Sequence, residues 1–382
     1  MQATSRSRVH FAWQRPNVWE VFRSAVSLHS HTSHSRETLD FIPRLSRAVP
    51  LLREAVEAQE RRYKRIHGRE IDYFGAWWTP PLGPREALAV ERAQIVEKLG
   101  LQPLVSLSDH DNIEAPLLLR ALEEGRDTPV SLEWTVPWAG TFFHLGIHNL
   151  PPRRAAQRMA ALAEFTRNPR QEELEGLLDW IVEDPHTLVV FNHPCWDEKG
   201  IGHQAHCREA AAFARRFRAA IHAIELNGLR PWTENRLNVA LADSLDLPVI
   251  SGGDRHTSEP NALVNLTNAA TFGEFVEEVR DYGYSHVLVM PQYREPLSLR
   301  IMHAIADVMK DNERHTHGWT RWTDRVFFRR ATGQVVSLAD SWHAGGQPVI
   351  VSAFAGLARL AGTPPMRVAL RQLSAPVQEL VL

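Results

Sequence analysis

The feature that most constrains the fold of this chain is a repeated pairing of short apolar runs with metal-binding side chains. Six times, a strand-like run ends in histidines or carboxylates, the side chains that bind divalent transition metals. The six motifs are Leu28-His29-Ser30-His31, Ser108-Asp109-His110-Asp111, Leu132-Glu133, Phe143-His144-Leu145-Gly146, Asn192-His193-Pro194 and Gly253-Asp254-Arg255-His256. Clusters of the same chemistry, each after an apolar run, predict one shared pocket.

The apolar runs alternate with amphipathic helical stretches. We expect strands at 25–28, 104–107, 130–132, 142–145, 187–191, 222–226 and 248–251, and helices at 172–183, 208–218 and 233–244. Strands that alternate with helices predict a parallel β/α architecture. Such folds place their sites at the carboxyl ends of the strands, which is where the motifs lie. We therefore predict an α/β fold in the form of a distorted β/α barrel.

A long insertion separates the first two predicted strands. It spans about 39–100 and contains a charged helical run at 53–65. An aromatic stretch at 71–81, punctuated by glycine and proline, follows that run. This stretch could form a lid over the pocket or a packed hydrophobic plug.

The region after residue 290 also lies outside a bare barrel. It holds helical stretches at 297–309 and 349–360 and a segment rich in tryptophan and arginine at 319–330. We predict a barrel over 1–290 and a C-terminal accessory segment over 291–382. That segment could serve dimerisation, which would make the protein a homo-oligomer.

The composition is that of an ordinary globular protein, with 382 residues of which 44% are hydrophobic and 23% charged. The net charge of −2 counts against long nucleic acid as a partner. The sequence has no uncharged apolar run of about 18 residues or more, so we predict no membrane span. The first residues also lack the apolar core of a secretory signal. Cys195 and Cys207 do not make a disulfide framework. We therefore expect a cytoplasmic protein without a membrane partner.

The spacing within the motifs favours metal binding. In His29-x-His31 the two imidazoles point the same way, because side chains alternate along a strand. Asp254 and His256 share this spacing. Glu133 ends an apolar run, where a lone buried carboxylate would carry a large desolvation cost. Bridging two cations would offset that cost.

Some motif residues also have structural interpretations. Asp109 could orient the neighbouring imidazole of His110, as carboxylates often do beside a ligating histidine, or it could cap the following helix. We expect Asp111 to take that capping role. The pair His315-x-His317 repeats the opening spacing, but it lies in a polar segment without strand context. We interpret it as a solvated loop.

Taken in order, the motifs closely resemble those of the polymerase and histidinol phosphatase (PHP) family of metal-dependent phosphoesterases. The resemblance covers roughly residues 24 to 290. It rests on the opening H-x-H, a strand-end D-H, a glutamate strand followed by H-L-G, a histidine–proline step and a closing G-S-D-x-H, in which Gly253 replaces the serine. A further glutamate strand of the family is similar to the segment around Glu225. The resemblance implies a distorted (β/α)7 barrel that holds two or three divalent metal ions, with zinc, manganese and iron as candidates.

The resemblance also implies how the ligands divide among the metals. The implied ligands are His29, His31, Glu133 and Asp254 for the first metal, Glu133, His144 and His193 for the second, and His110 and His256 for the third. The third site departs from the family pattern, because the segment after the opening motif reads His34-Ser35-Arg36-Glu37. Glu37 could supply the missing ligand, and His34 is the weaker substitute.

These residues predict a phosphoesterase in which a hydroxide held between the metals attacks phosphorus. Asp109 and Arg255 are the candidate catalytic residues. Arg230 and Arg255 are the candidate substrate-binding residues, because a planar guanidinium matches phosphate. The expected substrate is a small phosphorylated molecule or a nucleotide. The alternatives are a nuclease that acts on short oligonucleotides, a hydrolase of another bond, and a non-catalytic metal-bound module that serves a partner protein.

Overall fold

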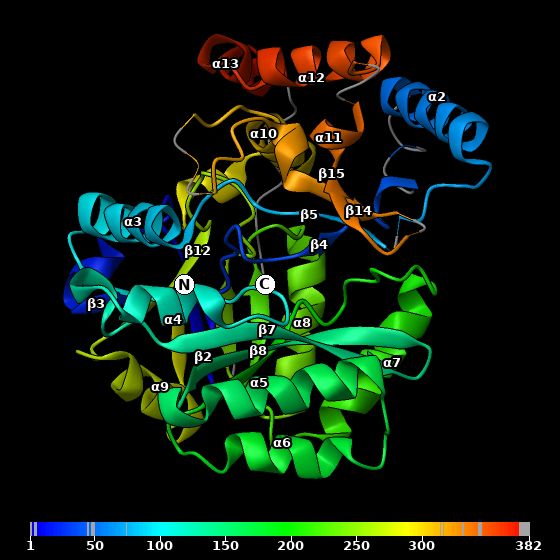
Figure 1. Cartoon of the computed structure of the whole chain (residues 1–382). Helices are drawn as coiled ribbons and strands as arrows, with labels where there is room; N and C mark the ends of the chain where they lie inside the picture. Colours follow the sequence, from blue (N-terminus) through cyan, green and yellow to red (C-terminus); the bar gives the residue numbers. More distant parts are fainter. Residues whose placement is uncertain are drawn as a thin grey trace.

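The chain adopts a mixed α/β fold in which helices surround three sheets (Figure 1). The computed structural model describes residues 2–3, 6–43, 46, 50–73, 75–313, 315, 317–330, 332–342 and 346–373, and the arrangement below refers to them. The predicted α/β class is therefore correct.

The largest sheet has the strand order β1-β2-β13-β12-β3-β6. Its strands are β1 (Gln2–Ala3), β2 (Ser7–Phe11), β3 (Ser24–Ser27), β6 (Gln102–Val105), β12 (Leu263–Thr267) and β13 (Ser285–Val289). β3 and β6 are parallel, whereas β12 runs antiparallel to both of its neighbours. The predicted first and second strands thus lie side by side, although the long insertion separates them in sequence.

The second sheet has the order β11-β10-β9-β8-β7. Its strands are β7 (Val130–Trp138), β8 (Thr141–Leu150), β9 (Leu188–Asn192), β10 (Ala223–Asn227) and β11 (Val249–Gly252). β9, β10 and β11 are parallel, but β8 runs antiparallel to β7 and β9, so the prediction of a parallel sheet is wrong there. The physical reason is the turn at Ala139 and Gly140, whose φ angles of 43° and 80° suit a tight hairpin.

The two sheets meet at the carboxyl ends of their strands. Isolated parallel bridges join Ser30 to Arg255 and His110 to Glu133. Among the described residues, the named strands do not pair into one closed barrel. The bridges instead bring the ends of β3, β6 and β11 and the middle of β7 together, and every one of these segments carries a predicted metal ligand.

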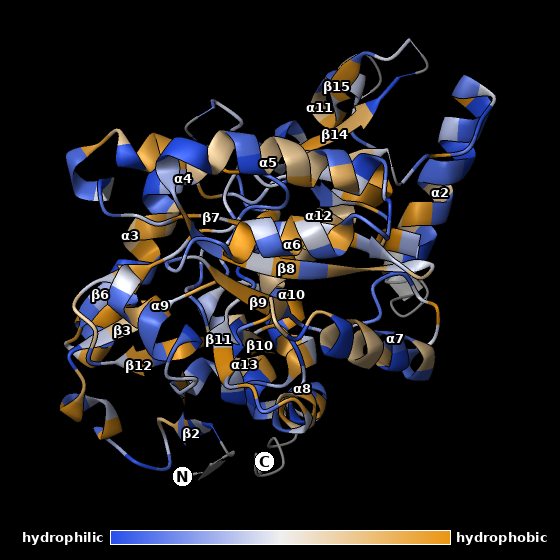
Figure 2. Cartoon of the chain, turned by 90° about the horizontal axis from the view of Figure 1, so that it is seen from below, coloured by the Kyte–Doolittle hydropathy of each residue, from blue (hydrophilic) through white to orange (hydrophobic). Residues whose placement is uncertain are grey.

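Helices cover the outer faces of the two sheets. They are η1 (Val18–Val21), α3 (Pro84–Gln94), η2 (Ile95–Leu99), α4 (Glu114–Arg120), η3 (Glu123–Gly125), α5 (Pro152–Arg167), α6 (Leu174–Val182), α7 (His203–Arg216), α8 (Trp232–Ser244) and α9 (Phe272–Arg280). Figure 2 shows α5 and α6 against the apolar strands of the second sheet. The main core packs the second sheet against several of these helices and includes Trp134 of β7, Leu162 of α5 and Phe213 of α7, each of which is buried. This burial holds the strand ends in fixed positions.

A small third sheet has the order β15-β14-β5-β4 and lies beyond the carboxyl ends of the other strands (Figure 1). Its strands are β4 (Glu37–Thr38), β5 (Ala76–Trp78), β14 (Val326–Arg329) and β15 (Val335–Ser337). We call it the cap sheet. It joins a strand of the predicted insertion to two strands of the predicted C-terminal segment. The domain division at residue 290 stays a prediction, but the two additions share this sheet.

The remaining helices form the outer part of the cap region. They are α2 (Pro50–His67), η4 (Pro291–Arg294), α10 (Leu297–Val308), η5 (Trp322–Arg325), α11 (Leu338–Trp342), α12 (Val349–Ala361) and α13 (Pro364–Leu373). The predicted helical run at 53–65 lies inside α2. No single helix of the described chain has the length and apolar character to cross a bilayer. Among the described helices, only α12 and α13 taken together have that length and apolar character, and the chain bends by 76° between them.

Candidate metal centre

Sharp backbone turns place several predicted ligands over the strand ends. His29 follows β3, His193 follows β9 and Asp254 follows β11. Their φ angles are 60°, 27° and 53°, in the left-handed region that residues other than glycine rarely adopt. Such conformations persist only where the surrounding structure holds them, and they concentrate at functional sites.

Glu133 is the central carboxylate of the site and is fully buried. Its two oxygens face five imidazoles. The distances from Oε2 are 2.9 Å to His29 Nε2, 3.3 Å to His31 Nε2 and 3.4 Å to His110 Nε2, and those from Oε1 are 3.0 Å to His193 Nε2 and 3.6 Å to His144 Nδ1. Burial alone would raise the pKa of Glu133, but the imidazoles hold it well below the usual range. The two oxygens thus face two different sets of imidazoles, as a bridging ligand requires.

Asp254 provides a second carboxylate on the same side as the opening motif. Its Oδ1 lies 3.7 Å from His29 Nε2 and 3.5 Å from His31 Nε2. The same oxygen is 3.4 Å from His256 Nδ1. Together with Glu133, these side chains surround the position at which the sequence predicts the first metal.

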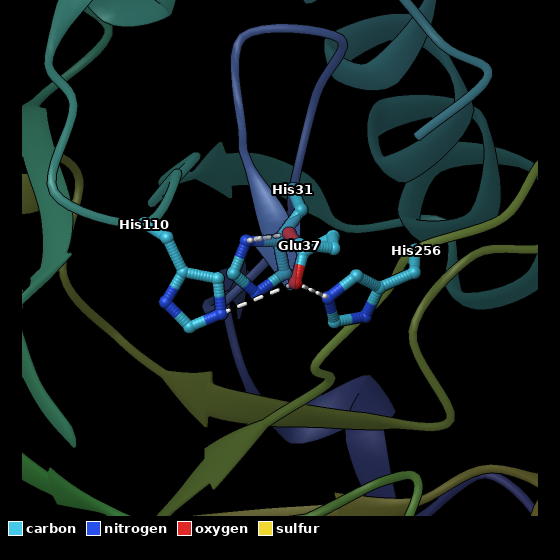
Figure 3. A group of neighbouring side chains, drawn as sticks. All are labelled: His31, Glu37, His110 and His256. Carbon is cyan, nitrogen blue, oxygen red and sulfur yellow. Dashed lines mark ion pairs between the residues drawn. The ribbon is translucent and has the colours of Figure 1, made fainter. Parts of the chain in front are cut away.

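Glu37 lies among the imidazoles of His31, His110 and His256, as Figure 3 shows. Its Oε2 is 3.1 Å from His256 Nε2 and 3.3 Å from His110 Nε2, and its Oε1 is 3.6 Å from His31 Nδ1. Burial would raise the pKa of Glu37, but these imidazoles hold it well below the usual range. The structure thus brings Glu37 to the place of the predicted third metal, whereas His34 Nδ1 faces away to Glu114 Oε2 at 3.0 Å.

Four groups of described side chains have ligand atoms within 4.8 Å of one another and could hold a metal ion. The groups are His31, Glu37, His110 and His256; His29, His31 and Glu133; His29, His193 and Glu225; and His110, Glu133 and His144. They contain every predicted ligand except Asp254, which contacts them, and they add Glu225. We call these residues, with Asp254, the ligand cluster. Its imidazole and carboxylate donors fit zinc, manganese or iron.

Glu225 is a site residue that the sequence motifs did not mark as a ligand. His29 Nδ1 lies 2.5 Å from its Oε1, and its Oε2 accepts a hydrogen bond of 2.8 Å from the backbone N–H of His193. Glu225 therefore orients His29 so that Nε2 faces Glu133. Gly252 leaves room for this contact, because a Cβ there would lie 1.6 Å from Glu225 Oε1. A buried glutamate within an apolar strand was the available signal, as it was for Glu133.

The two predicted substrate-binding arginines lie in different surroundings. Arg230 Nη2 is 3.7 Å from Asp254 Oδ2, and its guanidinium lies 3.3 Å from the centroid of the Trp196 ring. Arg255 is buried, and its Nε lies 2.8 Å from Glu91 Oε1. Its Nη2 donates to the carbonyl oxygen of His31 at 3.1 Å. The Arg255 guanidinium is committed to these partners, so we do not retain it as a catalytic or substrate-binding residue.

Asp109 and Asp111 hold loops. Asp109 is fully buried and accepts hydrogen bonds from the backbone N–H and the hydroxyl of Thr32, at 2.5 and 2.7 Å, so it anchors the opening loop. Asp111 accepts from the backbone N–H of Thr135 at 2.9 Å. The expected helix-capping role of Asp111 is wrong, because the side chain of Asn112 accepts from the first N–H of α4.

The expectation that His315 and His317 form a solvated loop is wrong for His315 alone, because His317 is exposed. His315 is buried and stacks on Trp319 with ring centroids 5.4 Å apart. The ring of His317 lies 5.5 Å from that of His34. Aromatic packing against Trp319, which a local pattern does not reveal, removes the His315 imidazole from water.

A small cavity adjoins the ligand cluster next to His144. It has a volume of about 10 Å³, room for roughly one water molecule. Its lining residues are Phe142, Phe143, His144, Asn192, His193, Trp196, Glu198 and His206. Glu198 had no place in the sequence prediction. Its Oε2 lies 4.0 Å from His144 Nδ1, and burial raises the pKa of this carboxyl to about 7.

Comparison with known proteins identifies no family for this chain. No protein-family model matches it, and no curated protein matches it. Among solved structures, an amidohydrolase from Chromobacterium violaceum with bound sulfate and no metal is 15% identical, with a TM-score of 0.35, over 59% of this chain and 92% of that one. A candidate metal-dependent phosphoesterase from Bifidobacterium adolescentis is 15% identical, with a TM-score of 0.33, over 53% and 92%. PsfC from Pseudomonas syringae is 16% identical, with a TM-score of 0.37, over 71% and 93%. Similarities this slight carry no argument about activity.

Proposed function

We propose that this protein is a metal-dependent phosphoesterase of the PHP type that uses two or three divalent metal ions. The observation that carries the proposal is the position of Glu133, a buried carboxylate whose oxygens face five imidazoles from separate positions along the chain. Burying an unpaired carboxylate is costly. A bridging role between cations explains why both oxygens are surrounded by metal-binding side chains.

The ligand cluster divides into three sets on this proposal. The first metal would be held by His29, His31, Glu133 and Asp254, and the third by Glu37 and His256 with His31 or His110. The second would be held by Glu133, His144 and His193, whose two imidazoles face the same Glu133 oxygen. When bound, the ions would lower the pKa of water and neutralise charge on the phosphoryl oxygens.

Residues around the cluster prepare it for a phosphoryl group. Arg230 is the cation whose guanidinium lies beside Asp254 and would bind phosphoryl oxygens through its planar fork. Stacking on Trp196 fixes the plane of that guanidinium. Glu225 holds the ring of His29, and Asp109 holds the backbone at Thr32. These contacts would keep the donors in place before a substrate arrives.

The substrate we propose is a small phosphorylated molecule or a nucleotide. His110 and His256, with side chains 17% exposed, are the most accessible imidazoles of the cluster, whereas those of His29 and His31 are 1% and 0% exposed. Trp78 of the cap sheet lies beside His256, with ring centroids 5.9 Å apart. An aromatic side chain beside one of the most accessible imidazoles favours a compact phosphoester over a long nucleic acid.

The proposal is tested by measuring bound metal per chain in gently purified protein, together with hydrolysis of p-nitrophenyl phosphate and a panel of phosphoesters with added manganese. We expect two or three metals and turnover. His193→Ala and Asp254→Ala should abolish turnover while the far-ultraviolet circular dichroism stays native. A metal-loaded protein that hydrolyses no phosphoester would overturn the proposal and favour the non-catalytic metal-bound module.

A further inference from the structure

The loop after β9 presents a carboxylate to the ligand cluster. The backbone N–H of Trp196 donates to the carbonyl oxygen of His193 at 2.9 Å, which turns the chain directly after that ligand. The carboxylate of Asp197 then accepts three backbone N–H groups, from residues 200, 201 and 202, at 2.8, 3.0 and 2.7 Å. Glu198 directly follows Asp197 in this anchored loop, and its side chain lines the cavity beside His144.

The Glu198 carboxylate has an unusual environment. Its Oε2 is shielded from solvent and makes no hydrogen bond to any described residue. Aromatic rings of Phe142 and Trp196 line the same cavity. A carboxylate oxygen that has lost water and gained no donor carries a large desolvation cost, and buried charges of this kind are usually paired or coordinate a metal.

The geometry around His144 indicates what would offset that cost. Nδ1 of His144 faces two carboxylates at once, Glu133 Oε1 at 3.6 Å and Glu198 Oε2 at 4.0 Å. His193 Nε2 lies 3.0 Å from the same Glu133 oxygen. The two carboxylates thus both face the imidazole nitrogen of His144, which the proposal assigns to the second metal, and Glu133 also faces His193.

We propose that Glu198 is a further ligand of the second metal ion and completes the set formed by Glu133, His144 and His193. This inference rests on the proposed metal-dependent function and deepens it. Three protein ligands leave a zinc-type site open, and a fourth ligand that stands at the cavity would restrict how many positions remain for water or substrate. Glu198 thus sets the coordination of the metal nearest to the cavity.

The test compares Glu198→Gln with wild type and with Glu114→Gln as a matched control. Glu114 also faces a histidine, with Oε2 3.0 Å from His34 Nδ1, but it is mostly exposed and lies outside the ligand cluster. The chelated proteins are titrated with cobalt, which is followed by its visible absorption, and metal per chain is measured after gel filtration. Thermal unfolding of each protein is measured in chelator and in excess metal.

We expect Glu198→Gln to bind one metal at least about tenfold more weakly than wild type, because even an outer partner of a ligand contributes roughly that much. The stabilisation gained on adding metal should fall correspondingly, while Glu114→Gln behaves as wild type.

Wild-type stoichiometry, affinity and cobalt spectrum in Glu198→Gln would overturn this inference and leave the phosphoesterase proposal intact. A wild-type protein that binds no metal would overturn both. Glu198→Asp keeps the charge, and we expect an intermediate affinity, which separates loss of a ligand from loss of folding.

Discussion

Glu37 Oε2 lies 3.1 Å from His256 Nε2, so a strand of the cap sheet contributes a side chain to a cluster built mainly on the other two sheets. In the cap sheet, Glu37 pairs with Trp78, and Trp78 pairs with Val326 of the C-terminal segment. Two regions that lie outside the predicted barrel therefore support one of the candidate metal ligands.

Glu37→Gln should remove one metal per chain and leave the others bound, because the amide is a much weaker ligand than the carboxylate between His31, His110 and His256. We expect the affinity for that metal to fall at least about tenfold. Elemental analysis after gel filtration measures the change. Asp40→Asn, a carboxylate in the same loop that accepts from Thr38, is the control and should keep its metals. Equal metal content in both variants would show that Glu37 is not a ligand.

Arg230→Met should lower kcat/KM for a phosphoester by about 10- to 150-fold, the effect of losing a hydrogen bond to a charged group. The loss is expected because Arg230 is the arginine that lies beside both Asp254 and Trp196. Steady-state kinetics provide the measurement. Arg236→Met, an exposed position on α8, is the control. An unchanged kcat/KM in Arg230→Met would exclude a contact between this residue and the substrate.

Arg255→Met should destabilise the protein by about 3–5 kcal/mol, because it leaves the buried carboxylate of Glu91 without its guanidinium. Both side chains are almost fully buried, at 2% and 0% exposure. Urea unfolding in the presence of chelator measures the loss. The KM of the folded fraction should stay at the wild-type value. A raised KM with unchanged stability would instead restore the substrate-binding role that the sequence suggested for Arg255.

The pair His10 and His286 should make stability fall as the pH is lowered. His10 Nε2 and His286 Nδ1 are 2.9 Å apart, so the two rings share one proton. Burial, together with nearby positive charge, lowers the pKa of both, that of His286 to about 4. A histidine whose pKa is lowered on folding stabilises the protein above its unfolded pKa of about 6.5 and loses that contribution as the pH falls toward the folded value.

The measurement for this pair is thermal unfolding of chelated protein between pH 7 and pH 4, for wild type and His286→Gln. The variant should show a shallower loss of stability across this interval, since one of the two depressed titrations is absent. Parallel curves for the two proteins would show that the pair does not contribute to the acid sensitivity.

The strands that carry the cluster could be predicted because their residues are apolar runs that tertiary packing did not override. The predicted helices also correspond to α6, α7 and α8. β12, β13 and the antiparallel course of β8 were missed. A continuous apolar run has no preferred strand direction, so only the turn at Ala139 and the pairing with Asn192 decide it.

Some residues of the site could likewise be identified from the sequence, and others could not. His29, Glu133 and His193 could be singled out because each pairs metal-binding chemistry with the end or edge of an apolar run. Glu198 could not, since its loop is polar and ordinary in sequence, and only the shielding of Oε2 beside His144 makes its carboxylate unusual. The contact of Arg255 with Glu91 could not be predicted, because a position between two candidate ligands says nothing about which way a side chain points.

By itself, the sequence determined the α/β class, the segments that bear the imidazoles and carboxylates, and the absence of a long apolar span. These properties are local, because they follow from residue type and from the period of hydrophobicity along the chain. Tertiary structure decided that Glu37 reaches the cluster from the cap sheet, that Arg255 turns to Glu91, and that Glu225 and Glu198 stand beside the candidate ligands. These contacts join residues that are far apart in sequence, and which of them form depends on how the sheets and loops pack.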